Sequence, residues 1–79
     1  MKPEALGKVA NSKLWNSDKA ENFLREALKI KEKSVGKNHP DVARILNRLG
    51  SLYIEKMDFQ LAEEYFGRAL EIRYFDMIL

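Results

Sequence analysis

Two arginines one helical turn apart are the side chains with the clearest capacity for chemistry in this sequence. Arg44 and Arg48 are four residues apart, a spacing that places both on the same face of an α-helix. Each guanidinium group presents a planar fork of N–H donors that fits a carboxylate in a bidentate manner. The pair therefore indicates recognition of a carboxylate-bearing ligand. Arginines that only solvate an exposed helix face show the same spacing, so both interpretations remain open at this point.

Residue types that serve catalysis and metal binding are scarce. The 79 residues include one histidine, His39, and no cysteine, which excludes a disulfide scaffold, a thiolate metal site and a multi-histidine metal site. Glu21 and the pair Glu63–Glu64 stand near expected helix starts, where carboxylates complement the helix dipole. Acid–base catalysis requires partners that converge in a pocket, and the pattern indicates none. We therefore expect a non-catalytic protein that needs no metal and no cofactor.

The composition is typical of one small globular domain. Hydrophobic residues make up 46% of the chain, charged residues 33%, and the net charge is +2. No apolar run approaches the roughly 20 residues of a membrane span, and the first ten residues lack the apolar core of a signal peptide. Nucleic-acid binders usually carry a denser basic stripe. We expect an intracellular, cytoplasmic domain that binds neither membrane nor nucleic acid.

The sequence contains an internal repeat. The segment AENFLREALKIK (residues 20–31) aligns with AEEYFGRALEIR (residues 62–73) at an offset of 42 residues. Five of the twelve aligned positions are identical, whereas ordinary composition gives about one. Upstream, Leu6-Gly7 matches Leu49-Gly50 at an offset of 43 residues. We therefore expect two structural units, at about 3–36 and about 40–77, with a joint at about 36–40.

Each unit is expected to contain two α-helices. Apolar residues recur at helical spacing through residues 18–35, 40–56 and 59–77. A shorter helix with fewer apolar residues is expected at 3–13. The alternating pattern of a β-strand occurs nowhere in the sequence, so the predicted fold class is all-α.

Local signals predict where these helices begin and end. The run Asn16-Ser17-Asp18 offers candidate N-caps, and Glu21 stands three residues after Asp18, as a capping box requires. Asp58 is expected to cap the last helix. Gly36 suits the left-handed conformation that ends a helix, and Pro40 suits the first turn of the next one.

These patterns resemble the tetratricopeptide repeat, a helix-turn-helix unit. The second unit matches that family at Leu49, Gly50, Tyr53, Ala62, Phe66 and Ala69. The first unit matches at Leu6, Gly7, Ala20, Leu24 and Ala27, and it departs at Ala10, where the family prefers tyrosine. The 42-residue period and the joint at 36–43 resemble the longer repeats of kinesin light chains and nephrocystin-like proteins. The resemblance implies four antiparallel helices stacked as a short right-handed solenoid, with small residues where the helices cross.

The tripeptide His39-Pro40-Asp41 also matches a motif of J-domain co-chaperones, which are similar in length. In that family the tripeptide lies in an exposed loop, whereas here the apolar Val42 and Ala43 follow at once. The 42-residue repeat has no counterpart in a J-domain. The repeat family is therefore favoured, and His39 is expected at the N-terminus of a helix.

The resemblance to tetratricopeptide repeats implies a protein–protein interaction scaffold whose concave face holds a peptide partner. In that family, lysine, asparagine and arginine side chains on the first helix of each unit hold a C-terminal carboxylate or acidic side chains. The corresponding positions in this sequence are Lys8, Asn11, Arg44, Asn47, Arg48, Ser51 and Glu55. The alternative function is a structural or oligomerisation segment, cut from a longer repeat array, that has no peptide ligand of its own.

The last seven residues, 73–79, are mostly apolar. Tyr74, Phe75, Ile78 and Leu79 share one face if the last helix continues to the end. Leaving such side chains in water forgoes roughly 1.5–3 kcal/mol each relative to full burial. We expect a homodimer formed through this tail or by exchange of helix pairs at the joint 36–40. A frayed tail is the competing interpretation.

Overall fold

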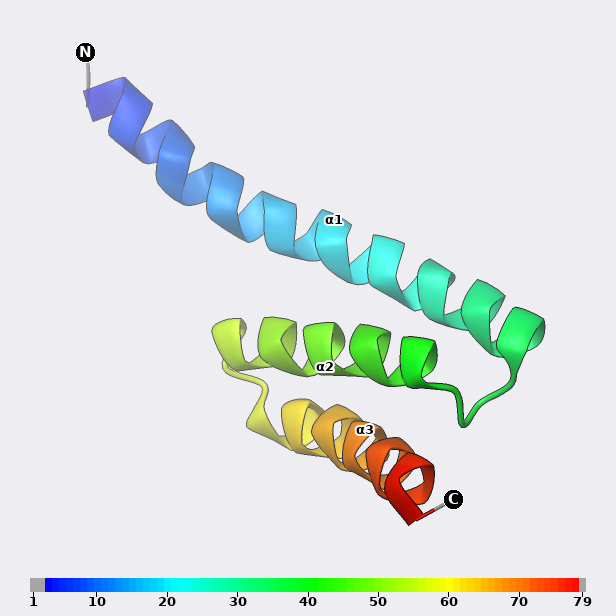
Figure 1. Ribbon diagram of the computed structural model, residues 1–79. Coiled ribbons are helices and arrows are strands. Elements are labelled where there is room, and N and C mark those ends of the chain that lie inside the picture. The colour runs from blue at the N-terminus through cyan, green and yellow to red at the C-terminus, as the bar shows by residue number, and fades with distance from the viewer. Residues whose placement is uncertain (1–2, 79) are drawn as a thin grey trace.

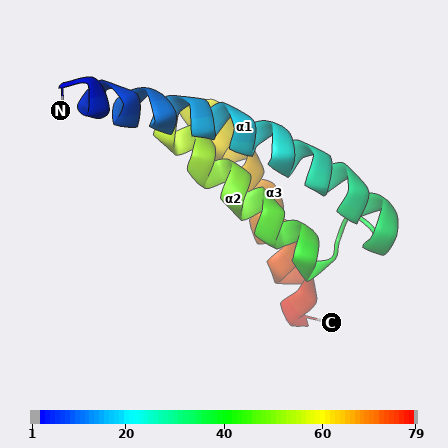
Figure 2. The same ribbon diagram turned by 90° about the horizontal axis from the view of Figure 1, so that it is seen from above.

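The computed structural model describes the backbone of residues 3–78 and the side chains of residues 17–78. Three helices follow one another: α1 (Pro3–Val35), α2 (Pro40–Glu55) and α3 (Phe59–Ile78). Over residues 3–78 there is no strand, which confirms the all-α prediction. Helix α2 lies between the other two and runs antiparallel to each (Figures 1 and 2). The described chain measures 56 × 24 × 17 Å, and α1 accounts for the long dimension because 33 helical residues extend about 50 Å.

The predicted ends of the helices agree with the structure in the second half of the chain. His39 is the N-cap of α2, where its Nδ1 accepts a 3.0 Å hydrogen bond from the amide of Asp41, and Pro40 occupies the first turn. Asp58 caps α3, because its Oδ1 accepts a 3.3 Å hydrogen bond from an amide in the first turn of that helix. Gly36 ends α1 with φ of +92°, a conformation that glycine adopts without strain.

The break expected between the first two helices is absent. Helix α1 runs without interruption from Pro3 to Val35, so the prediction of separate helices at 3–13 and 18–35 is wrong. Two physical reasons account for the continuity. Residues 8–35 contain neither glycine nor proline. In addition, the expected capping side chains bind α2 instead: Lys56 Nζ donates to Asp18 Oδ1 at 2.5 Å and to Glu21 Oε1 at 2.6 Å.

The turn between α2 and α3 has backbone features that end a helix, and α1 lacks them at the corresponding position. Met57 adopts φ of +65°, the left-handed conformation that follows many helix ends. The amide of Asp58 donates a 2.8 Å hydrogen bond to the carbonyl of Tyr53, which closes the turn. The chain therefore reverses here, and α3 packs back along α2.

The hydrophobic core is centred on α2. Its fully buried side chains are Val42, Leu46 and Leu49. The other core residues are Leu28 from α1, Ala43 and Tyr53 from α2, and Ala62, Ala69 and Ile72 from α3. A Cβ added at Gly50 would lie only 2.9 Å from ring atoms of Phe66, so α2 and α3 approach closely at that point. The prediction that small residues stand where these two helices cross is thereby confirmed.

Candidate functional site

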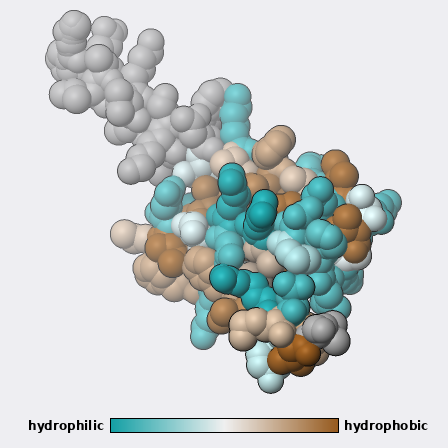
Figure 3. All heavy atoms as spheres, viewed as in Figure 1, coloured by the Kyte–Doolittle hydropathy of each residue, from teal (hydrophilic) through white to brown (hydrophobic). Residues whose placement is uncertain are grey.

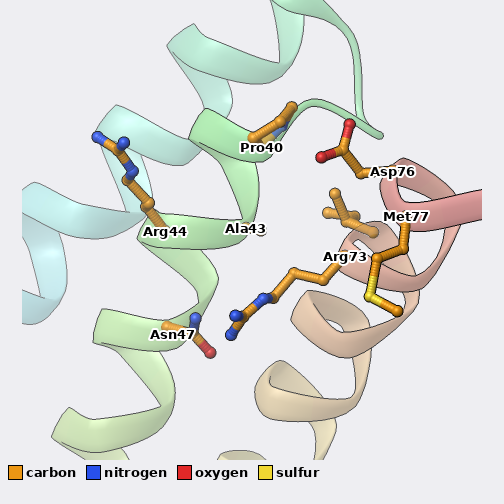
Figure 4. A pocket seen from close by; sticks show the side chains of 8 residues that line it. Pro40, Ala43, Arg44, Asn47, Arg73, Asp76 and Met77 are labelled. Atoms are coloured by element: carbon orange, nitrogen blue, oxygen red, sulfur yellow. The ribbon is translucent and has the colours of Figure 1, made fainter.

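A cleft of about 430 Å³ lies between the first half of α2 and the second half of α3 (Figure 4). It is lined by Pro40, Ala43, Arg44, Asn47, Ile72, Arg73, Asp76 and Met77. Because the two helices are antiparallel, the last turns of α3 lie beside the first turns of α2. The buried side chains of Ala43 and Ile72 form an apolar floor, and the polar side chains stand around it.

Asn47 and Arg73 carry the converging polar groups of the cleft. Figure 4 shows the amide of Asn47 and the guanidinium group of Arg73 pointing toward one another from α2 and α3. The guanidinium group of Arg44 points away from them, and Asp76 lies near Pro40. Two helices therefore present N–H donors to one space, with a single carboxylate at its end.

The arginines around the cleft have no partners among the side chains that the structure describes, which are those of residues 17–78. No hydrogen bond or ion pair within that range engages Arg44, Arg48 or Arg73. Elsewhere a guanidinium group is paired: Arg68 donates to Glu32 Oε2 at 2.9 Å, which links α3 to α1. A ligand carboxylate could therefore bind the arginines near the cleft without displacing an existing partner.

The structure brings together only part of the predicted peptide-binding set. Arg44 and Asn47 line the cleft. Three others are exposed on α2 but lie outside the cleft lining, namely Arg48, Ser51 and Glu55. Two more, Lys8 and Asn11, belong to α1, but their side chains lie outside the described residues.

Sequence reasoning missed the contribution of α3 to this cleft. Arg73, Asp76 and Met77 line the cleft but are not among the site residues that the sequence pattern predicts. The available signal was the position of Arg73 directly after Ile72, which the repeat predicts to be apolar and helix-facing. A residue next to such a position lies at the edge of the helix–helix contact, where a cleft wall forms.

A second group of polar residues, the α1–α2 polar cluster, consists of Asp18, Glu21, Arg25, Tyr53 and Lys56. Glu21 accepts hydrogen bonds from Lys56 Nζ at 2.6 Å, Tyr53 Oη at 2.6 Å and Arg25 Nε at 3.1 Å. These bonds, above all that from Lys56, lower the pKa of Glu21 from 4.5 to about 2. Burial is the main cause that raises the pKa of Tyr53 to about 12. Because every member has a partner, the cluster serves to join the two helices.

Metal-binding and membrane-spanning features were sought over the same part of the chain. No group of three or more histidine, aspartate or glutamate side chains among the described residues is arranged to hold a metal ion. Within the part of the chain that the structure describes, none of the three helices has both the length and the apolar character that crossing a bilayer requires.

Antiparallel helices encoded by a sequence repeat, with α2 and α3 crossing at a small residue beside a polar cleft, are typical of a helical-repeat protein. The family model of the tetratricopeptide repeat matches residues 3–74. The chain therefore belongs to the tetratricopeptide repeat family, whose repeats generally mediate protein–protein interactions and are typically non-catalytic. No curated protein and no solved structure matches the sequence.

Proposed function

We propose that the chain is a non-catalytic scaffold that binds a short peptide bearing carboxylates in the cleft between α2 and α3. The observation that carries the proposal is that Arg44 and Arg73 line one cleft from its two helices and have no hydrogen-bond or ion-pair partner among the side chains of residues 17–78. Guanidinium groups bind carboxylates through paired, charge-assisted hydrogen bonds. The volume of about 430 Å³ lies in the range typical of ligand sites.

Each wall of the cleft has a role in this proposal. The amide of Asn47 and the guanidinium group of Arg73 hold the peptide carboxylate or its backbone. Arg44 is exposed and has no partner among residues 17–78, so its side chain can rotate toward the same ligand. Met77 and the apolar floor contact the aliphatic part of the peptide. Asp76 repels a second carboxylate placed at its end of the cleft, so it orients the peptide.

We propose that the remaining predicted residues extend the site along α2 and onto the first unit. Arg48, Ser51 and Glu55 continue the exposed face of α2 beyond the cleft. The two-unit division, at about 3–36 and about 40–77, assigns Lys8 and Asn11 to the first unit, on the continuous helix α1. The 42-residue period supports repeats of the long kind found in kinesin light chains.

Fluorescence anisotropy with labelled peptides tests the carboxylate mechanism. An acidic peptide with a free C-terminus should bind at least about tenfold more tightly than a neutral, amidated peptide, a difference of about 1.4 kcal/mol. The double variant Arg44→Ala/Arg48→Ala and the single variant Arg73→Ala should each weaken binding of the acidic peptide. The control Lys29→Ala/Lys33→Ala removes two positive charges from exposed positions of α1 outside the cleft. Equal affinity for both peptides, or an equal loss in the control, rejects the mechanism.

A second candidate function, self-association through the end of α3, is favoured by apolar side chains that are exposed there. Tyr74, Phe75 and Ile78 are 61%, 49% and 58% exposed, and Leu79 lies outside the described residues. The rings of Tyr74 and Phe75 meet edge to face, with centroids 6.3 Å apart. Sedimentation of the full chain and of a version ending at Arg73 tests this role. A dimer that survives the truncation excludes the tail and leaves exchange at the joint 36–40, which stays a prediction.

A further inference from the structure

The side of α1 that faces away from α2 combines apolar and basic side chains, and it is called here the α1 outer face. Phe23 and Ile30 are 73% and 66% exposed and line an apolar hollow of about 330 Å³. Ile30 also lines a neighbouring hollow of about 420 Å³ together with Lys29 and Lys33. Among the side chains of residues 17–78, neither lysine has an ion-pair partner. Glu26 lines both hollows, so positive charge exceeds negative charge on this face.

The side of α3 that faces away from α2, the α3 outer face, combines apolar and acidic side chains. Leu70, Tyr74 and Ile78 follow one another at spacings of four residues and are 64%, 61% and 58% exposed. Glu64 and Glu71 are exposed along one edge of this stripe. Neither carboxylate forms an ion pair with the described side chains of residues 17–78. The two outer faces therefore both carry exposed apolar side chains and have opposite charges.

Gly67 leaves the middle of the α3 outer face open. An added Cβ there would meet no atom within 4 Å, so packing within the chain does not require a glycine at this position. Glycine is also less favourable than alanine inside a helix. In the core, Gly50 allows the ring of Phe66 to approach the backbone of α2 closely. Gly67 offers the same kind of surface to a bulky side chain of another molecule, such as Phe23.

The two outer faces of one chain cannot meet, because α2 lies between α1 and α3 (Figure 1). Figure 3 shows hydrophobic side chains at the surface over the C-terminal half of α1 and at the end of α3. We propose that the α3 outer face of one copy binds the α1 outer face of a second copy. The apolar stripes are then buried against each other, and lysines without partners meet glutamates without partners. Self-association through α3, the second candidate function, is the premise of this contact, and peptide binding in the cleft is independent of it.

The positions of the charges set the direction in which the two facing helices run. Viewed from the N-terminus of each helix, Lys29 and Lys33 lie counterclockwise of the apolar stripe of α1, whereas Glu64 and Glu71 lie clockwise of the apolar stripe of α3. These two edges meet when the facing helices are parallel, and an antiparallel arrangement would place the lysines beside Arg73 instead.

The parallel arrangement determines the kind of assembly. Within one chain α1 and α3 are both antiparallel to α2, so each added copy keeps the orientation of the one before it (Figure 1). A head-to-tail contact of this kind does not close after two copies and builds an open series. Because one helix face from each copy forms a small contact of the transient class, we expect a monomer at the low micromolar concentrations of a denaturation experiment.

Sedimentation equilibrium of the full chain, from micromolar to millimolar concentration, tests the assembly. The average mass should rise with concentration beyond that of a dimer, and it should rise less at high salt because salt screens exposed charges. A monomer at millimolar concentration, or a mass that stops at a dimer, overturns the proposal.

Reversal of the charges on each face tests which surfaces meet. Lys29→Glu/Lys33→Glu and Glu64→Lys/Glu71→Lys should each raise the concentration at which association begins by at least about tenfold, a difference of about 1.4 kcal/mol. Each variant alone places like charges across the contact. An equal mixture should associate as the wild type does, because the acidic α1 outer face of the first variant meets the basic α3 outer face of the second. Undiminished association of either variant alone, or a monomeric mixture, overturns the proposal.

An uncharged substitution separates this contact from general attraction between charged proteins. Phe23→Ser/Ile30→Ser removes the apolar stripe of α1 without changing the net charge, and it should abolish association but leave binding of the acidic peptide to the cleft unchanged. The matched control is Met57→Asn in the turn after α2, since Met57 is 77% exposed and asparagine tolerates its positive φ. That control should associate as the wild type does. Association that persists in the Phe23→Ser/Ile30→Ser variant, or is lost in the control, overturns the proposal.

Discussion

The contact between α2 and α3 and the contact between α1 and α2 hold antiparallel helices together by different means. The α2–α3 contact is apolar and close, since Gly50 meets the ring of Phe66 and the alanines of α3 are buried. The α1–α2 contact buries Leu28 and adds the α1–α2 polar cluster, in which one carboxylate accepts three hydrogen bonds.

This difference shows that repeat-related helices need not be held by the same forces. The repeat counterpart of Glu21 is Glu63, which is exposed and makes no ion pair with the residues that the structure describes. An apolar contact depends on volume and is nearly independent of pH, whereas a contact held by ionised groups depends on their protonation. Substitutions and acid should therefore affect the two contacts separately.

Truncating a side chain in the core that the two contacts share should cause the largest loss of stability. Leu46 is fully buried within the cluster that includes Leu28 of α1 and Ala69 of α3. Leu46→Ala should lower the free energy of unfolding by about 2–5 kcal/mol, a large fraction of the stability of a small domain. Urea denaturation followed by circular dichroism measures this loss. The exposed control Leu70→Ala should change stability by no more than about 0.5 kcal/mol, and equal losses would contradict the assigned core.

Adding a side chain where α2 and α3 approach closely should cause the next largest loss of stability. Gly50→Val places side-chain atoms within the space of the Phe66 ring and should cost about 1–3 kcal/mol through overpacking. The control is Gly67→Ala, because an added Cβ there meets no atom within 4 Å. That control should stabilise the protein by up to about 1 kcal/mol through helix propensity. Destabilisation by both variants would show that the close approach is not the cause.

Acid should weaken the α1–α2 contact selectively. The pKa of Glu21 falls from 4.5 to about 2 on folding, so the folded state favours the carboxylate. Its stabilisation of about 1–2 kcal/mol is present above about pH 5 and is lost as the pH falls toward 2. Glu21→Gln should lose this stability at neutral pH and show a flatter decline between pH 5 and pH 2. In the control, Glu63→Gln, urea denaturation should give the same dependence of stability on pH as the wild type. A flatter dependence in that control would show that the effect comes from the loss of a negative charge in general and not from the hydrogen bonds of Glu21.

The sequence by itself determined the all-α class, the repeat, the extents of α2 and α3, and the small residues at their crossing. These features depend on signals that act over a few residues. Helical spacing sets the buried face, His39, Pro40 and Asp58 set the starts of helices, and Gly36 ends one. Signals of this kind act before distant parts of the chain meet, so their outcome could be predicted from the residues alone.

Only the tertiary structure decided that α1 is continuous and that the cleft has a second wall from α3. Asp18 and Glu21 can cap a helix locally or bind Lys56, which is 38 and 35 residues away, and the long-range contact prevails. Arg73 enters the cleft because antiparallel packing places the end of α3 beside the start of α2. Both outcomes depend on which distant groups meet, and no pattern within a single helix carries that information.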